Sequence, residues 1–86
     1  MELVLYTSTF CAPCVRARSV LRDAGTLLPQ ARIREVDVLS HLRESEELRI
    51  ESTPTLVVRR NGTEVFRASG VPSVQQVLAA AALALD

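Results

Sequence analysis

The position of the two cysteines, Cys11 and Cys14, constrains the fold more than any other feature of the sequence. Both lie in one tetrapeptide, between the apolar run 2–6 with its polar continuation and a segment whose apolar residues recur at helical spacing. A short apolar run bounded by polar residues predicts a buried strand, and the 3.6-residue period predicts an amphipathic helix. The sequence therefore predicts that both cysteines lie at a strand-to-helix junction.

The helix predicted at this junction begins at the cysteines and ends at Gly25, the type of residue that commonly terminates helices. Pro13 falls in the first turn, where a missing backbone N–H breaks no hydrogen bond. Four residues form the apolar side of this helix: Ala17, Val20, Leu21 and Ala24.

Alternation, turn signals and capping patterns predict the remaining elements. We expect a strand over residues 32–38, a charged helix over 40–49 and a strand over 55–59. Asn61-Gly62 predicts a hairpin turn into a strand over 63–68. A Ser-x-x-Gln capping box at Ser73 predicts a final helix. The expected apolar anchors are Leu39, Leu42 and Leu48 for the charged helix, and Val74, Val77, Leu78, Ala81 and Leu85 for the final one.

These elements predict an α/β fold of order βαβαββα in a single domain over residues 1–86, because 86 residues is the size of one domain. A strand–helix–strand unit implies a right-handed parallel crossover. The Asn-Gly hairpin adds an antiparallel pair. We therefore expect a mixed four-stranded sheet flanked by three helices, with helices on both faces.

Composition excludes several function classes. The formal net charge is zero and aromatic residues make up 3% of the chain, which argues against binding to nucleic acid or to an anionic membrane. The apolar start is too short for a signal peptide and lacks a basic leader. No apolar run reaches the roughly 20 residues of a membrane helix. We expect a cytoplasmic protein.

The spacing of the cysteines predicts redox chemistry. Residues three apart at a helix start lie within about 5–6 Å at Cβ, near the range of a disulfide. The helix N-terminus stabilises an anion, so the pKa of the Cys11 thiol should fall, with Arg16 and Arg18 near in sequence. We expect Cys11, the more exposed thiol, to attack a substrate disulfide and Cys14 to resolve the mixed disulfide.

Other interpretations of the cysteine pair remain open. A purely structural disulfide would close a very small loop and would stabilise the fold little. A zinc or iron–sulfur half-site would need ligands from a second subunit, because His41 is the only histidine. Inert thiols are a third alternative. We expect His41 to be a solvated surface residue, and the acidic run to form a solvated face: Glu44, Glu46, Glu47 and Glu51.

Three motifs resemble the thioredoxin superfamily over nearly the whole chain: Cys11-Ala12-Pro13-Cys14, Thr53-Pro54-Thr55 and Asn61-Gly62. The length and the first strand are glutaredoxin-like, whereas Pro13 and residues 53–58 are more similar to thioredoxin. The resemblance implies a thioredoxin-like fold, a redox-active Cys11–Cys14 disulfide and no bound cofactor. It also implies a monomeric electron carrier that reduces protein disulfides and is itself reduced by a thioredoxin reductase or a low-molecular-weight thiol.

The resemblance also implies further site residues. Pro54 would be cis and would face the cysteines, so that the N–H and C=O of Thr53 pair with an extended substrate. An ordinary trans proline is the alternative. Gly70 would let the substrate approach closely, or would be a simple turn glycine. The expected rim of the active site is Phe10, Ala12, Pro13, Thr53, Pro54 and Gly70, with no metal ligand.

Three departures from the family pattern bear on function. Phe10 occupies the position of a tryptophan, and Leu5 that of a buried aspartate which accepts a proton from the second cysteine. The segment Gly70-Val71-Pro72-Ser73 lacks the paired glycine and the acid with which glutaredoxins bind glutathione, although Ser73 and the helix N-terminus would suit a carboxylate. The alternatives are therefore a glutathione-coupled reductase, and a metal-binding or structural module on the same scaffold.

Overall fold

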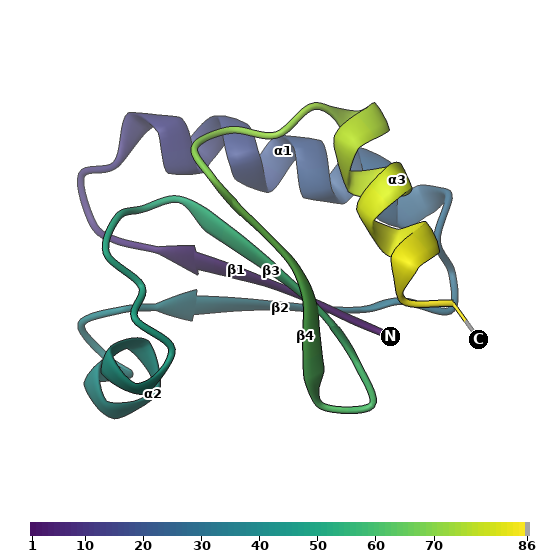
Figure 1. Ribbon diagram of the computed structural model, residues 1–86. Coiled ribbons are helices and arrows are strands. Elements are labelled where there is room, and N and C mark those ends of the chain that lie inside the picture. Colours follow the sequence, from purple (N-terminus) through teal and green to yellow (C-terminus); the bar gives the residue numbers. More distant parts are fainter. Residues whose placement is uncertain (86) are drawn as a thin grey trace.

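The computed structural model, which describes residues 1–85, contains the strand–helix–strand unit predicted around the cysteines (Figure 1). The chain then adds a short helix, an antiparallel hairpin and a C-terminal helix, in the predicted order. The elements are β1 (Glu2–Thr7), α1 (Ala12–Thr26), β2 (Arg32–Asp37), α2 (Leu42–Glu47), β3 (Thr55–Arg60), β4 (Thr63–Ser69) and α3 (Val74–Leu83).

The four strands form one mixed sheet in the order β2-β1-β3-β4. β1 is parallel to β2 and antiparallel to β3, and β4 is antiparallel to β3. α1 and α3 cover one face of the sheet and α2 lies on the other (Figure 1). The predicted mixed α/β sheet with helices on both faces is confirmed, and this topology places the cysteines at the carboxyl end of the central strand β1.

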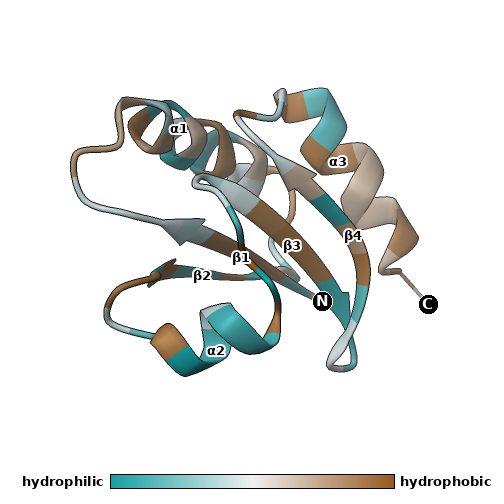
Figure 2. Ribbon diagram, turned by 60° about the vertical axis from the view of Figure 1, so that its left-hand side comes forward, coloured by the Kyte–Doolittle hydropathy of each residue, from teal (hydrophilic) through white to brown (hydrophobic). Residues whose placement is uncertain are grey.

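Two apolar clusters hold the layers together, and both contain residues of β1 and β3, two central strands rich in apolar residues (Figure 2). Alternate residues of β1 pack on opposite faces of the sheet, because successive side chains of a strand point to opposite sides. Leu3 and Leu5 pack toward α1 and α3, whereas Val4 and Tyr6 pack toward the α2 side. The larger cluster also contains Ala17, Leu21, Ala24, Leu56, Val58, Val77, Ala80 and Ala84; the smaller one contains Val36 and Val57.

The prediction that Gly25 ends the first helix is wrong, because α1 continues to Thr26 and its C-cap is Leu27. Gly25 instead lies where the helix approaches β2. A Cβ built on Gly25 would come within 2.8 Å of Cδ1 of Ile33. The glycine therefore leaves room for the end of the Ile33 side chain, which is 44% exposed.

The charged helix is shorter than predicted, since α2 spans Leu42–Glu47 rather than residues 40–49. Two of its three expected anchors are wrong: Leu39 is 65% exposed and Leu42 is 54% exposed. Leu48 does pack against the smaller apolar cluster, together with Val38 and Ile50. A six-residue helix has few intrahelical bonds of its own, so tertiary contacts must hold it in place.

Glu44 provides such a contact, which corrects the prediction that the whole acidic run is solvated. Its carboxylate accepts a 2.6 Å hydrogen bond from the hydroxyl of the buried Tyr6 and a 2.5 Å bond from Arg34. Arg59 also donates to the Tyr6 hydroxyl, at 3.3 Å. Burial by itself raises the pKa of Glu44, but the bonds from Tyr6 and Arg34 outweigh it and hold this pKa below its usual value. Burial and the bond to Glu44 raise the pKa of Tyr6.

We predict that Tyr6→Phe lowers the free energy of unfolding at pH 7 by about 1.5 kcal/mol, since hydrogen bonds to charged groups contribute roughly 1.5–3 kcal/mol. The contribution of Glu44 is fully present above its unfolded pKa and is lost as pH falls through the lower folded pKa. Urea unfolding at pH 7 and pH 3 measures both effects. Glu44→Gln should weaken the acid dependence, and the exposed Glu46→Gln should not; equal acid dependence of both variants would contradict this.

The predicted turn and cap are both confirmed. Asn61 and Gly62 have positive φ values of 50° and 80°, as a type I′ hairpin turn requires. Ser73 Oγ accepts a hydrogen bond from Gln76 N, and the Gln76 side chain accepts one from Ser73 N. Leu85 lies beyond α3 and is 50% exposed, so its predicted place on the apolar side of that helix is wrong. Within residues 1–85, no helix has the length and apolarity needed to cross a membrane.

Candidate active site

The cysteines lie at the N-terminus of α1, as predicted. Cys11 is the N-cap residue, and its Sγ accepts a 3.1 Å hydrogen bond from the backbone N–H of Cys14. A disulfide joins the two residues, whose Cα atoms are 5.2 Å apart. Because the first N–H groups of a helix have no intrahelical partner, they are free to stabilise a thiolate on Cys11 when the disulfide is reduced.

The two sulfur-bearing residues differ in exposure. Cys14 is 1% exposed, whereas Cys11 is partly exposed, which confirms the expectation that Cys11 is the more accessible. Leu5 is 1% exposed and packs with Ala17 and Leu21 of α1 in the larger apolar cluster. It therefore contributes packing at this position of β1 and offers no group to accept a proton.

The segment before β3 forms a second wall of the site. The peptide bond between Thr53 and Pro54 is cis, as the family resemblance implied. The C=O of Pro54 accepts a 2.9 Å hydrogen bond from Gly70 N, which joins this segment to the end of β4. Gly70 has a positive φ of 87°, and a Cβ there would meet no atom within 4 Å. Backbone conformation rather than crowding therefore explains this glycine in the unliganded protein.

Three of the expected rim residues, Phe10, Ala12 and Pro13, lie next to the cysteines in the sequence. Phe10, directly before Cys11, is fully exposed and has a positive φ of 55°. Ala12 is exposed and Pro13 is partly exposed in the first turn of α1. Val71, next to Gly70 in the sequence, is 38% exposed. The side chains next to Cys11 in the sequence, Phe10 and Ala12, are therefore exposed and uncharged.

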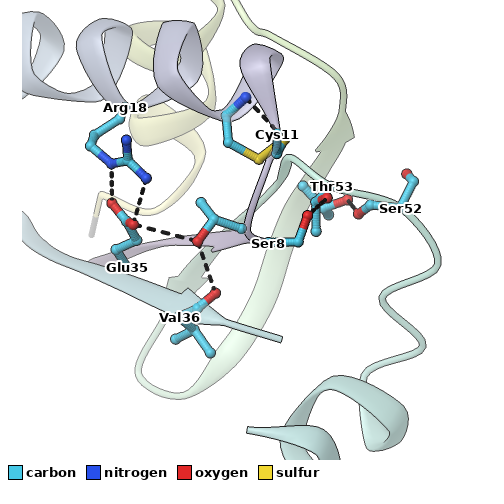
Figure 3. Close-up of a disulfide and its surroundings, with 10 residues drawn as sticks. Ser8, Cys11, Arg18, Glu35, Val36, Ser52 and Thr53 are labelled. Carbon is cyan, nitrogen blue, oxygen red and sulfur yellow. Dashed lines mark hydrogen bonds and ion pairs between the residues drawn. A yellow bond between two sulfur atoms is a disulfide. The ribbon is translucent and has the colours of Figure 1, made fainter. Parts of the chain in front are cut away.

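A groove of about 630 Å³ opens beside Cys11, and Phe10 and Ala12 belong to its lining. Its polar lining includes an ion pair from Arg18 to Glu35, with N–O distances of 2.7 and 2.9 Å, and Thr7 lies 3.4 Å from the same carboxylate. Figure 3 shows this pair beside the disulfide. The hydrogen bonds from Arg18 lower the pKa of Glu35. Because Arg18 is paired with a carboxylate, the positive potential that the sequence predicted from it is largely neutralised.

His41 lies at the N-cap position of α2 and is exposed, as predicted. Its ring Nδ1 is 3.2 Å from the backbone O of Asp37. Among residues 1–85, no group of three or more His, Cys, Asp or Glu side chains is arranged to hold a metal ion.

Sequence reasoning missed the Arg18–Glu35 pair and also a hydrogen bond of 2.6 Å between Ser8 Oγ and Thr53 Oγ1. This hydrogen bond links the loop that leads to Cys11 with the segment that leads to Pro54. The two hydroxyls are 45 residues apart in the sequence, and no local pattern pairs them. Figure 3 shows the pair on the side of the disulfide opposite Arg18 and Glu35.

Comparisons with known proteins agree with this geometry. A family model described as Thioredoxin matches residues 1–82. The thioredoxin of Chlamydia trachomatis is 33% identical over 71 residues, which cover 83% of this chain and 70% of the relative. A solved structure of desulfothioredoxin from Desulfovibrio vulgaris Hildenborough, in its reduced form, is 30% identical. It superposes with a TM-score of 0.85 over 94% of this chain and 78% of its own.

A more distant solved structure supports the fold alone. A malarial protein, 15% identical, superposes with a TM-score of 0.88 over 99% of this chain and 97% of its own. The family model and both named relatives are thioredoxins, and the glutaredoxin-like features of length and first strand stay predictions.

Proposed function

The chain belongs to the thioredoxin family and is a thiol–disulfide oxidoreductase with an internal redox-active disulfide, and we propose that Cys11 is its attacking thiolate and Cys14 its resolving thiol. In the reduced protein, the Cys11 thiolate attacks one sulfur of a substrate disulfide. The other substrate sulfur leaves as a thiolate, and a mixed disulfide forms. Cys14, after losing its proton, attacks Cys11 Sγ and releases the second substrate sulfur, so two electrons pass to the substrate.

One observation carries the assignment of the two roles. Cys11 Sγ is the N-cap acceptor of α1 and is partly exposed, whereas Cys14 lies inside the helix and is 1% exposed. An attacking sulfur must be both accessible and stabilised as an anion, and only Cys11 meets both conditions. A buried sulfur in the same turn is placed to attack a partner already bound to Cys11.

We propose that a protein substrate docks on the rim between Phe10 and Gly70, with Thr53 as its backbone partner. Among residues 1–85, no backbone hydrogen bond is described for the N–H or the C=O of Thr53. Thr53 is partly exposed, so both groups are free for an extended segment, as in strand addition. The exposed side chains of Phe10 and Val71 supply apolar contact on either side.

We propose a thioredoxin-reductase-type donor rather than glutathione. A glutathione carboxylate would need a free helix N-terminus near Gly70. There the Ser73 side chain already accepts from Gln76 N, and the Ser73 N–H already donates to Gln76 Oε1. The capping box of α3 thus already engages two of the N–H groups that could hold the carboxylate. A cytoplasmic location and a monomeric state stay predictions.

Turnover assays with two electron donors test this proposal. Reduction of a protein disulfide is followed with NADPH and a bacterial thioredoxin reductase, and in parallel with NADPH, glutathione and glutathione reductase. We expect turnover with the first system at a rate at least tenfold above the second. Turnover with glutathione alone would overturn the donor assignment, and turnover with neither donor nor with dithiothreitol would overturn the assigned reductase role.

A further inference from the structure

We propose that Ser8 is a positioning residue for substrate docking, which acts through its hydrogen bond to Thr53; this rests on the function proposed above. Ser8 lies in the loop between β1 and α1, three residues before Cys11. Thr53 lies directly before Pro54, in the segment that leads into β3. The 2.6 Å bond between their hydroxyls therefore joins the two parts of the site that a substrate must contact together.

The segment that carries Thr53 is joined to the end of β4 by the backbone bond from Gly70 N to the C=O of Pro54, and few side-chain hydrogen bonds hold it. Residues 48–54 connect α2 to β3 without regular structure. Arg67 holds the early part of the segment by donating to the C=O of Arg49, and the Thr55 hydroxyl donates locally to the C=O of Ser52. Among the described contacts of residues 51–53, the bond from Thr53 to Ser8 is the only side-chain hydrogen bond to a distant element.

The placement of this bond gives it a specific consequence. Both hydroxyls are partly buried and each has the other as its partner. Water therefore competes for this bond less than it would for a bond on the surface. It sets the distance between the Thr53 backbone and the Cys11 sulfur. An extended protein substrate must pair with the Thr53 backbone while its own sulfur meets the Cys11 sulfur. A small disulfide needs to reach only the Cys11 sulfur.

Steady-state kinetics of Ser8→Ala test the inference with two substrates, a protein disulfide and a small aromatic disulfide. We expect the kcat/KM for the protein disulfide, divided by that for the small disulfide, to fall about fivefold, which is the effect of one net hydrogen bond. The fall should come from a higher KM for the protein substrate. Ser8→Thr keeps a hydroxyl and should restore the ratio. Thr26→Val loses an exposed hydroxyl bond to Asp23 O at the far end of α1 and serves as the matched control.

A double-mutant cycle makes the test sharper. If Ser8 acts through Thr53, the variants Ser8→Ala and Thr53→Val should not be additive, and the double variant should resemble either single one. Additive losses, an unchanged ratio in Ser8→Ala, or an equal loss for both substrates would overturn the role of Ser8. Those outcomes leave the proposed function intact if wild type turns over, whereas an inactive wild type would overturn the proposed function itself.

Discussion

Replacement of Cys11 by serine should abolish catalysed disulfide reduction, with a loss of roughly 10³-fold or more, because the reaction loses its nucleophile. Cys11 is the accessible sulfur at the N-terminus of α1, and its removal leaves only the buried Cys14. The measurement is the initial rate of protein disulfide reduction with dithiothreitol as the electron donor. Ser19→Ala, on an exposed position of the same helix, is the control and should retain the wild-type rate.

Cys14→Ser should fail at a different step. Cys11 can still attack, but no second sulfur resolves the intermediate, so a mixed disulfide between Cys11 and the substrate should accumulate. Intact-mass spectrometry under non-reducing conditions detects this adduct. An adduct that forms in Cys11→Ser and not in Cys14→Ser would reverse the two roles, and wild-type activity of both variants would show that the pair is not the reactive centre.

Leu5→Ala should lower the free energy of unfolding by about 3 kcal/mol, within the 2–5 kcal/mol of buried leucine truncations. Leu5 is 1% exposed and packs on the helix that carries the cysteines. The loss is large for a small domain, whose whole stability is about 5–15 kcal/mol. Urea unfolding of the oxidised protein measures it.

Leu83→Ala is the matched control for this truncation. Leu83 is 57% exposed near the end of α3, so the same chemical change there should cost less than about 0.5 kcal/mol. Similar costs at the two positions would contradict the assignment of Leu5 to the core. They would also remove the packing explanation for a leucine where the family places a buried acid.

The sequence predicted the elements well wherever the signal lay within a few residues. The apolar run of β1, the helical spacing after Cys14, the Asn61-Gly62 turn and the Ser73 cap each depend on local periodicity, on backbone conformation or on a bond between near neighbours. Gly25 and α2 were predicted less well. Gly25 of α1 lies against the side chain of Ile33 on the next strand. The position of α2 depends on the hydrogen bond between Glu44 and Tyr6, which are 38 residues apart in the sequence.

In the candidate site, too, local features could be predicted from the sequence and long-range contacts could not. The sequence by itself determined that Cys11 and Cys14 lie at the start of a helix after a buried strand, because spacing and periodicity are local properties. Only the tertiary structure decided which groups surround them: the Arg18–Glu35 pair that neutralises one side, and the Ser8–Thr53 bond that ties the other. Such contacts depend on strand register and on the paths of loops, which arise from the packing of the whole sheet rather than from any one segment.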